Sequence, residues 1–213
     1  MAGPSLVRLF AFRAVEHGFD ERLRATIIPD LATAEGLTAC FSARQGPDDL
    51  GPRLVVTTWR DRDAMVRRLG EELGTFHPEA LADTADRRVE ILPLIVAERF
   101  AGAGEPRILR VFRGRVRPGE LDEYVSDLRD GAALDAASGD GPTSIHLGQV
   151  DDDRFVTVTT WRAWDHVEEA TGGDHEHPWS TRQPGRLLGW QVDHYELVTT
   201  VSPAVARDAI AAS

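Results

Sequence analysis

Histidines and carboxylates gather in one short stretch late in the chain, Asp174-His175-Glu176-His177-Pro178-Trp179. Imidazole and carboxylate groups are ligands that zinc and iron accept in proteins. Two histidines separated by one residue face the same side only in an extended backbone. No second cluster clearly completes a ligand shell, although His146 and His194 are candidates. A polar loop next to a helix is the simpler interpretation, so we expect no metal site.

His194 and Tyr195 lie in a stretch with a strand pattern, so their side chains point to opposite faces. A neutral imidazole there can act as a general base, or it can be a hydrogen-bonded part of the structure. We take His177 and His194 as the catalytic candidates. Arg8 and Arg110 recur at equivalent strand positions. Facing inward, each would need an acidic partner or a ligand; we expect the outward version, salt-bridged to a helix carboxylate.

Other residue types exclude several chemistries. The chain contains no Lys, which rules out Schiff-base catalysis and lysine-dependent phosphate loops. Its single Cys40 cannot form an intrachain disulfide, and its strand-like surroundings favour a core residue over a nucleophile. No G-x-S-x-G motif is present, and the glycine runs lack the strand and helix that flank a nucleotide-binding loop.

Charge and hydropathy narrow the choice of partners. The net charge is −11 without a long basic run, which argues against nucleic acid and anionic membranes. The longest apolar run, residues 91–97, is far shorter than the roughly 20 residues of a membrane-spanning helix. Arg8 and Arg13 interrupt any signal-peptide core near the start, so we expect a cytoplasmic protein.

The elements that must position these residues occur twice. Residues 55–60, Val-Val-Thr-Thr-Trp-Arg, recur as residues 157–162, Thr-Val-Thr-Thr-Trp-Arg, and the same offset of 102 positions carries residues 6–10 onto residues 108–112. Two distant matches in one register indicate a tandem duplication. A repeat of about 100 residues has the size of a small domain rather than of a solenoid unit.

Each half carries the same predicted order of elements, β-α-β-β-α-β, which is the ferredoxin-like arrangement. The predicted strands are residues 6–13, 38–44, 54–59 and 89–98 in the first half and residues 108–116, 144–150, 155–161 and 190–200 in the second. Pro29 is expected to kink or end the first helix, and Pro93 to mark an edge strand or a bulge. We place the first repeat at residues 1–100, the second at residues 107–202 and a tail at residues 203–213.

Helices cover only one face of a ferredoxin-like sheet, yet the predicted strands are apolar on both faces. The bare face therefore needs a cover, which the second repeat can supply. The sequence predicts an α+β fold in which tandem ferredoxin-like repeats pack sheet to sheet as an intrachain pseudo-dimeric α/β barrel. Because the fused halves can satisfy each other, we expect a monomer with an internal pseudo-twofold axis or a weak homodimer.

This pattern resembles the dimeric α/β-barrel superfamily and, within it, the antibiotic-biosynthesis-monooxygenase-like domains. The resemblance depends on the strands ending in Thr-Thr-Trp-Arg (57–60 and 159–162), each followed at once by a helix, and on the closing strand at residues 192–197. It implies a small-ligand pocket between each sheet and its helices, shaped by a Trp at the strand-to-helix junction. Trp59 and Trp161 match that position, although a Trp there can also simply fill the core.

Two activities are familiar in proteins of this kind: oxygenation of aromatic, polyketide-like substrates without a cofactor, and oxidative opening of heme. Both commonly employ an Asn near the ligand, and the chain contains none. Heme-degrading members also carry a His on the helix after the Trp. The nearest histidines here, His77, His175 and His177, all lie later in the chain than that role requires.

Three interpretations follow from the resemblance. The first is a cofactor-independent monooxygenase that binds a small aromatic molecule, with the second half as the active one. The second is a heme-binding or heme-degrading protein with His77 or His177 as the axial ligand. The third is a non-catalytic ligand-binding or scaffold barrel. The expected ligand-binding residues are Trp59, His77, Trp161, Trp164, His166 and Trp190.

Overall fold

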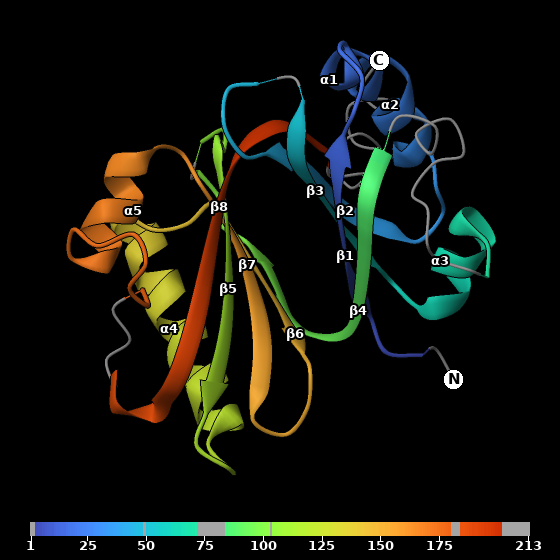
Figure 1. The fold of residues 1–213 in the computed structure, drawn as a ribbon. Helices are drawn as coiled ribbons and strands as arrows, with labels where there is room; N and C mark the ends of the chain where they lie inside the picture. The colour runs from blue at the N-terminus through green and yellow to red at the C-terminus, as the bar shows by residue number, and fades with distance from the viewer. Residues whose placement is uncertain (1–2, 49, 72–83, 103, 180–183, 202–213) are drawn as a thin grey trace. The chain divides into compact units, whose positions relative to one another are not determined.

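The computed structural model describes residues 3–48, 50–71, 84–102, 104–179 and 184–201 (Figure 1). The elements of the first repeat are β1 (Leu6–Ala14), α1 (Phe19–Arg22), a π-helical segment (Leu23–Ile27), α2 (Ile28–Ala32), β2 (Leu37–Arg44), β3 (Gly51–Trp59), α3 (Arg62–Leu69) and β4 (Thr84–Arg99). Those of the second are β5 (Ile108–Val116), α4 (Leu121–Ser138), β6 (Ser144–Gln149), β7 (Arg154–Trp161), α5 (Trp164–Thr171), a 3₁₀ turn (Pro184–Arg186) and β8 (Leu187–Val201). Both repeats therefore have the predicted β-α-β-β-α-β order.

The chain folds into two compact units. Unit 1 comprises residues 1–92 and 196–213, and unit 2 comprises residues 93–195. The predicted sequence repeats are residues 1–100 and 107–202. The compact units have different boundaries, at residues 92/93 within β4 and at residues 195/196 within β8. The last strand of each repeat thus begins in one unit and ends in the other. No helix in the described ranges is long and apolar enough to cross a membrane.

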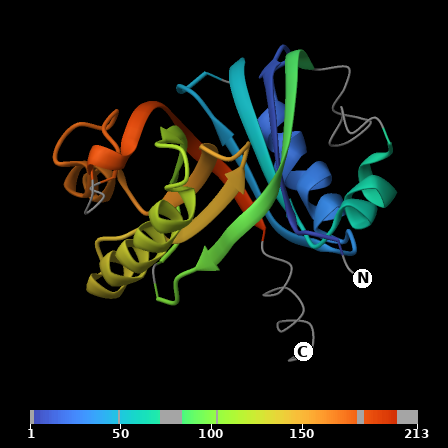
Figure 2. The ribbon, with the colours of Figure 1, turned by 90° about the horizontal axis from the view of Figure 1, so that it is seen from below.

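Each unit contains an antiparallel sheet with its helices on one face (Figure 2). The strand order is β4-β1-β3-β2-β8 in unit 1 and β8-β5-β7-β6-β4 in unit 2, so the complete hydrogen-bonded order closes on itself. β4 has a neighbour on each side in the strand order, so it is not the edge strand that Pro93 suggests; a register shift, typical of a bulge, lies close by, between Leu94 and Val96. The predicted α+β fold of tandem ferredoxin-like repeats, with the strand order of a pseudo-dimeric α/β barrel, is confirmed.

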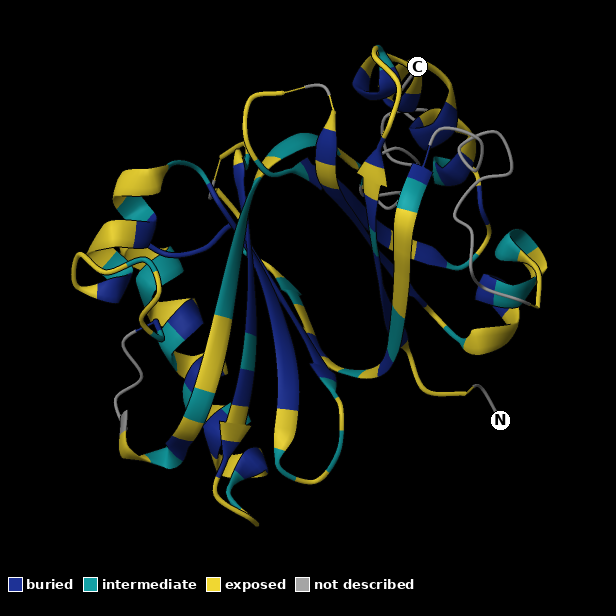
Figure 3. Cartoon of the chain, in the orientation of Figure 1, coloured by how far each residue is buried: buried dark blue, intermediate teal, exposed yellow. Residues whose placement is uncertain are grey.

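β1, β2, β3, β5, β6 and β7 are buried on both faces over most of their length, as their composition predicts, whereas most residues of β4 and β8 are partly or fully exposed. On β7, Phe155 and Trp161 belong to the core that faces the helices, and the alternating residues Val156 and Val158 on the other face are buried as well. Almost all of β7 is accordingly dark blue in Figure 3. Strands of this kind carry apolar side chains in both directions because neither face meets water.

The first helix of unit 1 contains a π-helical segment that its counterpart in unit 2, the continuous α4, lacks. The buried apolar residues at successive turns are Phe19, Leu23, Ile27 and Leu31 in unit 1, where Asp20 and Ile28 are buried as well, and Leu121, Tyr124, Leu128 and Ala132 in unit 2. The first pair is 102 residues apart and the other three pairs are 101 apart, so unit 1 carries one extra residue here. A π-helical turn accommodates such an insertion. Pro29 follows it in the first turn of α2 and breaks nothing, because the first turn needs no N–H from that position.

The two units also differ at one cross-strand pair. Phe12 faces Arg53 in unit 1, and Gly114 faces Phe155 at the equivalent place in unit 2. A Cβ on Gly114 would lie 2.3 Å from the ring of Phe155, so this ring needs the glycine. Phe155 in turn packs against Tyr124 of α4, with their ring centroids 4.6 Å apart.

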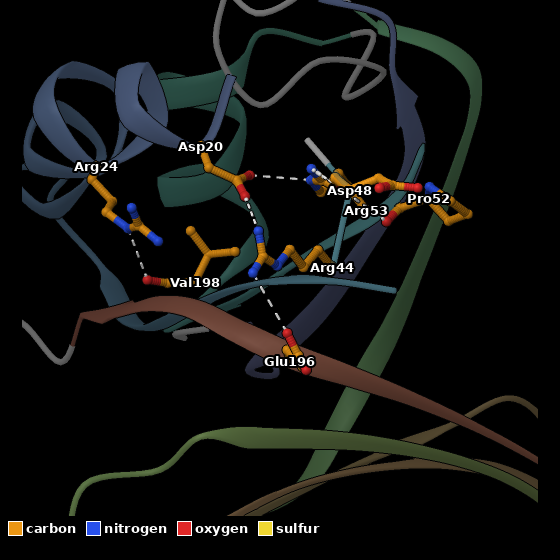
Figure 4. A network of polar contacts seen from close by, with 8 residues as sticks. All are labelled: Asp20, Arg24, Arg44, Asp48, Pro52, Arg53, Glu196 and Val198. Carbon is orange, nitrogen blue, oxygen red and sulfur yellow. Dashed lines mark hydrogen bonds and ion pairs between the residues drawn. The ribbon is translucent and has the colours of Figure 1, made fainter. Parts of the chain in front are cut away.

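At the position of Phe155, unit 1 has Arg53, which takes part in a polar network (Figure 4). Asp20, which is buried, accepts a hydrogen bond from Arg53 Nε at 3.1 Å and another from Arg44 Nη1 at 3.3 Å. Arg44 also pairs with Glu196 of β8, at 3.6 Å. The network ties the start of α1 to β2, β3 and the end of β8.

Replacing Asp20 with Ala should lower the free energy of unfolding by on the order of 3 kcal/mol, because the buried Arg53 charge then loses its carboxylate. Urea denaturation measures the change. Glu35→Ala is the control, since it removes an exposed partner of Arg60 and should leave stability almost unchanged. Equal effects of the two variants would contradict a structural role for the buried network.

His146 on β6 should make the protein acid-sensitive. Burial lowers the pKa of its imidazole to about 4 in the folded chain, against about 6.5 when unfolded. The unfolded state therefore binds the extra proton first, and stability that is full above pH 6.5 falls as the pH drops towards 4. Between pH 7.5 and pH 4.5, His146→Gln should lose roughly 2 to 3 kcal/mol less than the unmodified protein in urea denaturation. Identical pH slopes would show that His146 does not stay neutral.

Candidate functional site

The two repeated tryptophans are fully buried parts of the core. Trp59 Nε1 donates to Thr57 Oγ1 at 2.9 Å, and Trp161 Nε1 donates to Thr159 Oγ1 at 2.8 Å. Each Trp thereby fixes the hydroxyl of a threonine two positions earlier on the same strand. Trp161 also packs edge-on against Trp179, with their ring centroids 5.4 Å apart.

A small cavity lies in unit 2 between the sheet and α4. Its lining residues are Arg110 and Phe112 of β5, Tyr124 and Leu128 of α4, Thr157 and Thr159 of β7, and Trp179. The space open to the centre of a water molecule is about 10 Å³, which is room for about one water. Three aromatic rings and Leu128 make the wall mostly apolar, so the few polar groups set its chemistry.

Among the described residues that line this cavity, Arg110 is the one with a charged side chain. Its guanidinium lies over the Phe112 ring, with Cζ 5.4 Å from the centroid, and Nη2 donates to the backbone carbonyl of His177. Within the described residues it has no carboxylate partner. Burial lowers its pKa to about 10, so it remains charged at neutral pH.

The expectation of outward, ion-paired arginines was therefore wrong. Arg8 and Arg110 are both buried. Each points to the same face of its strand as the phenylalanine two positions later, Phe10 or Phe112, and that phenylalanine belongs to the core facing the helices. The inward version, which requires an acidic partner or a ligand, is the one that unit 2 shows.

Two polar atoms on the lining residues are buried without a hydrogen-bond partner among the described residues. They are Arg110 Nε, which can only donate, and Thr157 Oγ1, which can donate and accept. Buried polar groups in folded proteins are normally satisfied, and the exceptions require an explanation. A ligand oxygen placed between these two atoms would satisfy both.

Tyr124 adds a phenol to the same cavity. Burial raises the pKa of its hydroxyl, while the nearby Arg110 charge partly opposes the shift. The hydroxyl therefore stays protonated and can donate a hydrogen bond. Arg110, Tyr124 and Thr157 together suit an oxygen atom that carries negative charge.

Unit 1 does not repeat this polar lining. Arg8, Phe10 and Thr57 correspond to Arg110, Phe112 and Thr159, but Leu23 replaces Tyr124 and Val55 replaces Thr157. Among the described residues, the hydroxyls of Tyr124 and Thr157 therefore have no counterpart in unit 1. That the second half is the active one remains a prediction.

The stretch at residues 174–179 forms a turn rather than an extended metal site. Asp174 Oδ1 accepts from the Glu176 backbone N–H at 2.9 Å, and Asp174 Oδ2 lies 2.7 Å from His177 Nδ1. The His177 side chain is 60% exposed, so it is the backbone carbonyl of His177, not its imidazole, that contacts Arg110. In the described ranges no three His, Cys, Asp or Glu side chains converge as metal ligands.

His194 lies on β8, next to β5, in a cluster of rings. The Trp164 ring centroid is 5.2 Å from that of His194 and 5.2 Å from that of His175. Burial, and then the charges of Arg110 and His175, lower the pKa of His194 to about 4. Its Nε2 is buried without a hydrogen-bond partner in the described residues, so a neutral acceptor or donor is available there.

The remaining predicted ligand-binding residues do not line the cavity. His166 Nε2 lies 2.7 Å from Arg162 Nη2, and because arginine can only donate, His166 accepts. Trp190 is half exposed and its Nε1 donates to the Glu176 carbonyl at 2.9 Å. His77 lies outside the described residues.

Sequence reasoning missed Tyr124, Thr157 and Trp179 as lining residues. The signal for the first two lay in the differences between the repeats rather than in their likeness: a hydroxyl replaces an apolar side chain at each position. Trp179 gave only a weak signal, since its counterpart in the first repeat cannot be identified by the offset of 102.

Arg110→Met should raise the free energy of unfolding by about 1–3 kcal/mol, because it replaces a buried charge that has no carboxylate with an apolar chain of similar length. Thermal and urea unfolding measure the change. Arg53→Met should do the reverse, since it leaves Asp20 buried beside fewer donors. A loss of stability in Arg110→Met comparable to that in Arg53→Met would show that the Arg110 charge is already compensated.

No family model and no curated protein matches the sequence. Among solved structures, the chain is similar to a proposed monooxygenase of Fusobacterium nucleatum, with a TM-score of 0.71, 10% identity and coverage of 95% of this chain and 96% of the other. It is also similar to an anthrone oxidase-like protein (TM-score 0.58, 18% identity, 94% of each chain) and to a proposed chlorite dismutase (0.60, 13%, 92% and 96%). The fold of the chain is that of the dimeric α/β-barrel proteins to which these structures belong.

Proposed function

We propose that the chain is a small-molecule-binding protein whose working site is the cavity of unit 2, and that its ligand is an aromatic molecule with an ionisable oxygen. The observation that carries the proposal is the buried Arg110 guanidinium, which has no carboxylate partner in the described residues and an unsatisfied Nε. A buried cation is costly unless an anion or strong acceptor pairs with it.

The shape of the lining supports an aromatic ligand. Phe112, Tyr124 and Trp179 offer ring faces and edges, against which a planar ligand packs well. Arg110 Nε and Thr157 Oγ1 would hold the ligand oxygen, and a hydrogen bond from a guanidinium to a charged oxygen is roughly twice as strong as a neutral one. The site would therefore bind the deprotonated form of a phenol or enol in preference to the neutral form.

Holding that form gives the site its proposed chemistry. A phenolate or enolate is electron-rich, and O₂ can oxidise it without a cofactor. For an anthrone-type ligand the reaction converts a ring CH₂ into C=O, with one oxygen atom of O₂ entering the product and the other leaving as water. His194 does not line this cavity, and its low pKa makes it a weak base, so it is not proposed to remove the proton.

The cavity of unit 2 does not fit a heme. No histidine is among the described residues that line it, so no imidazole there could bind the iron. The imidazole of His177 is mostly exposed and lies beside Asp174. No heme step is therefore proposed for this site.

Titration with 4-nitrophenol tests the proposal, because its phenolate absorbs visible light. We expect the protein to bind the phenolate, to lower the apparent pKa of the bound phenol, and to bind the neutral analogue nitrobenzene much more weakly. Arg110→Gln should weaken phenolate binding by about 10- to 100-fold, the effect of one charge-assisted hydrogen bond. Arg115→Gln, an exposed arginine on the same strand, is the control and should bind normally. Equal binding by Arg110→Gln and the unmodified protein would refute the assigned site.

Oxygen uptake with anthrone then separates an enzyme from a binding protein. An oxygenase should consume one O₂ for each anthrone converted to anthraquinone, and Arg110→Gln should lose this activity. Phenolate binding without oxygen uptake would instead support the non-catalytic ligand-binding alternative.

A further inference from the structure

Residues 174–179, here called the strap, lie at the wall of the cavity and are held by four polar contacts to other described residues of unit 2. Arg110 Nη2 donates to the carbonyl of His177, and Trp190 Nε1 donates to the carbonyl of Glu176 at 2.9 Å. Trp179 Nε1 donates to Asp135 Oδ2 of α4 at 3.0 Å, and His175 Nε2 lies 3.0 Å from Glu168 Oε1 of α5. Two of these contacts thus end on backbone carbonyls of the strap, and the bond from Trp179 fixes the indole that lines the cavity.

The strap is also folded onto itself. Asp174 accepts hydrogen bonds from the backbone N–H of Glu176 and, through its own carbonyl, from the backbone N–H of His177, both at 2.9 Å. Its Oδ2 lies 2.7 Å from His177 Nδ1. Because these bonds lie inside the strap, they can persist when the four outer contacts break, and the turn around His177 can move as one piece.

We infer that the strap competes with the ligand for Arg110 and thereby selects ligands that carry an oxyanion. The inference rests on the proposed function of the same cavity. With the strap in place the cavity admits about one water, so a ring can enter only when the strap moves. Moving it removes the His177 carbonyl from Arg110 Nη2.

What replaces that carbonyl decides whether the ligand stays. A carbonyl is a neutral acceptor, and a phenolate or enolate oxygen is a stronger partner for a guanidinium. A neutral ring of the same shape would leave Nη2, in addition to Nε, buried without an acceptor. Only a ligand with an oxyanion therefore compensates Arg110 for the loss of the His177 carbonyl. Asp135 and Trp190, which hold the strap in place, act as positioning residues for specificity.

The strap also reduces affinity by a predictable amount. For a ligand that binds only when the strap is displaced, the apparent dissociation constant equals the intrinsic dissociation constant divided by the fraction of molecules with a displaced strap. Removing one outer hydrogen bond without touching the cavity raises that fraction. Asp135→Ala does this at the periphery, and alanine is well tolerated in the interior of α4.

Asp135→Ala should lower the apparent dissociation constant for 4-nitrophenolate by about fivefold, the effect of one hydrogen bond on the two populations. Asp135→Asn is the decisive control, because its Oδ1 still accepts from Trp179 while the negative charge is gone; it should bind like the unmodified protein. Asp130→Ala, an exposed carboxylate on the same helix, should also change nothing. If Asp135→Asn gains affinity as much as Asp135→Ala, charge and not the strap is responsible, and the inference fails.

Amide hydrogen exchange of the peptide containing residues 174–179 gives a second readout that binding strength cannot imitate. Displacement of the strap predicts faster exchange in the presence of 4-nitrophenolate, whereas a ligand bound under a closed strap predicts slower exchange. Binding that depends on Arg110 together with unchanged or slower exchange overturns the strap inference and leaves the proposed function intact. Absence of binding in both the unmodified protein and Asp135→Ala overturns the proposed function and the strap with it.

Discussion

A positive charge buried between a sheet and a helix is the constraint on which the second unit depends. Arg110 remains charged at neutral pH, yet in the described chain it is met only by one backbone carbonyl and the face of Phe112. Desolvating a guanidinium is expensive, and a fold selected for stability alone would place a methionine or leucine there. The arrangement of the surrounding threonine, tyrosine and strap makes sense as the surroundings of a group kept ready for an incoming anion.

The comparison of the two repeats shows how such a site can arise within a duplicated fold. Both retain the buried Arg, the following Phe and the Thr–Trp hydrogen bond, which are set by the strand register. Unit 1 places its polar bonds between Asp20, Arg44 and Arg53 and fills the helix side with Leu23. Unit 2 has Phe155 opposite a glycine, and this ring supports Tyr124 over the cavity. In unit 1 a buried carboxylate, Asp20, pairs with two arginines, whereas in unit 2 the buried Arg110 has no carboxylate partner among the described residues.

The fold followed from the sequence because its evidence is repeated and periodic. The ungapped 102-residue offset and the strand patterns gave β5 its exact bounds and gave the other strands to within a few residues, apart from the start of β4. The site did not follow in the same way. Strand alternation puts Arg8 and Arg110 on the same side as Phe10 and Phe112, but both arginines were expected outside because a buried guanidinium needs an acidic partner or a ligand. The π-helical segment hid the correspondence of Leu23 and Tyr124, because one inserted residue shifts the offset from 102 to 101. The strap contacts Arg110 through a backbone carbonyl, which no side-chain pattern encodes.

The passage of β4 and β8 from one compact unit into the other has a consequence for biosynthesis. The sheet of unit 1 includes β8, whose final residues come late in the chain, more than 150 positions after their partners in β2. A ribosome that has released the whole first repeat has therefore not yet delivered everything its sheet requires. The sheet of the first repeat is therefore incomplete without β8 of the second, although the two repeats have the same order of elements. Folding must wait for contacts between distant parts of the chain, which makes it intrinsically slow and leaves the nascent first half dependent on protection until translation ends.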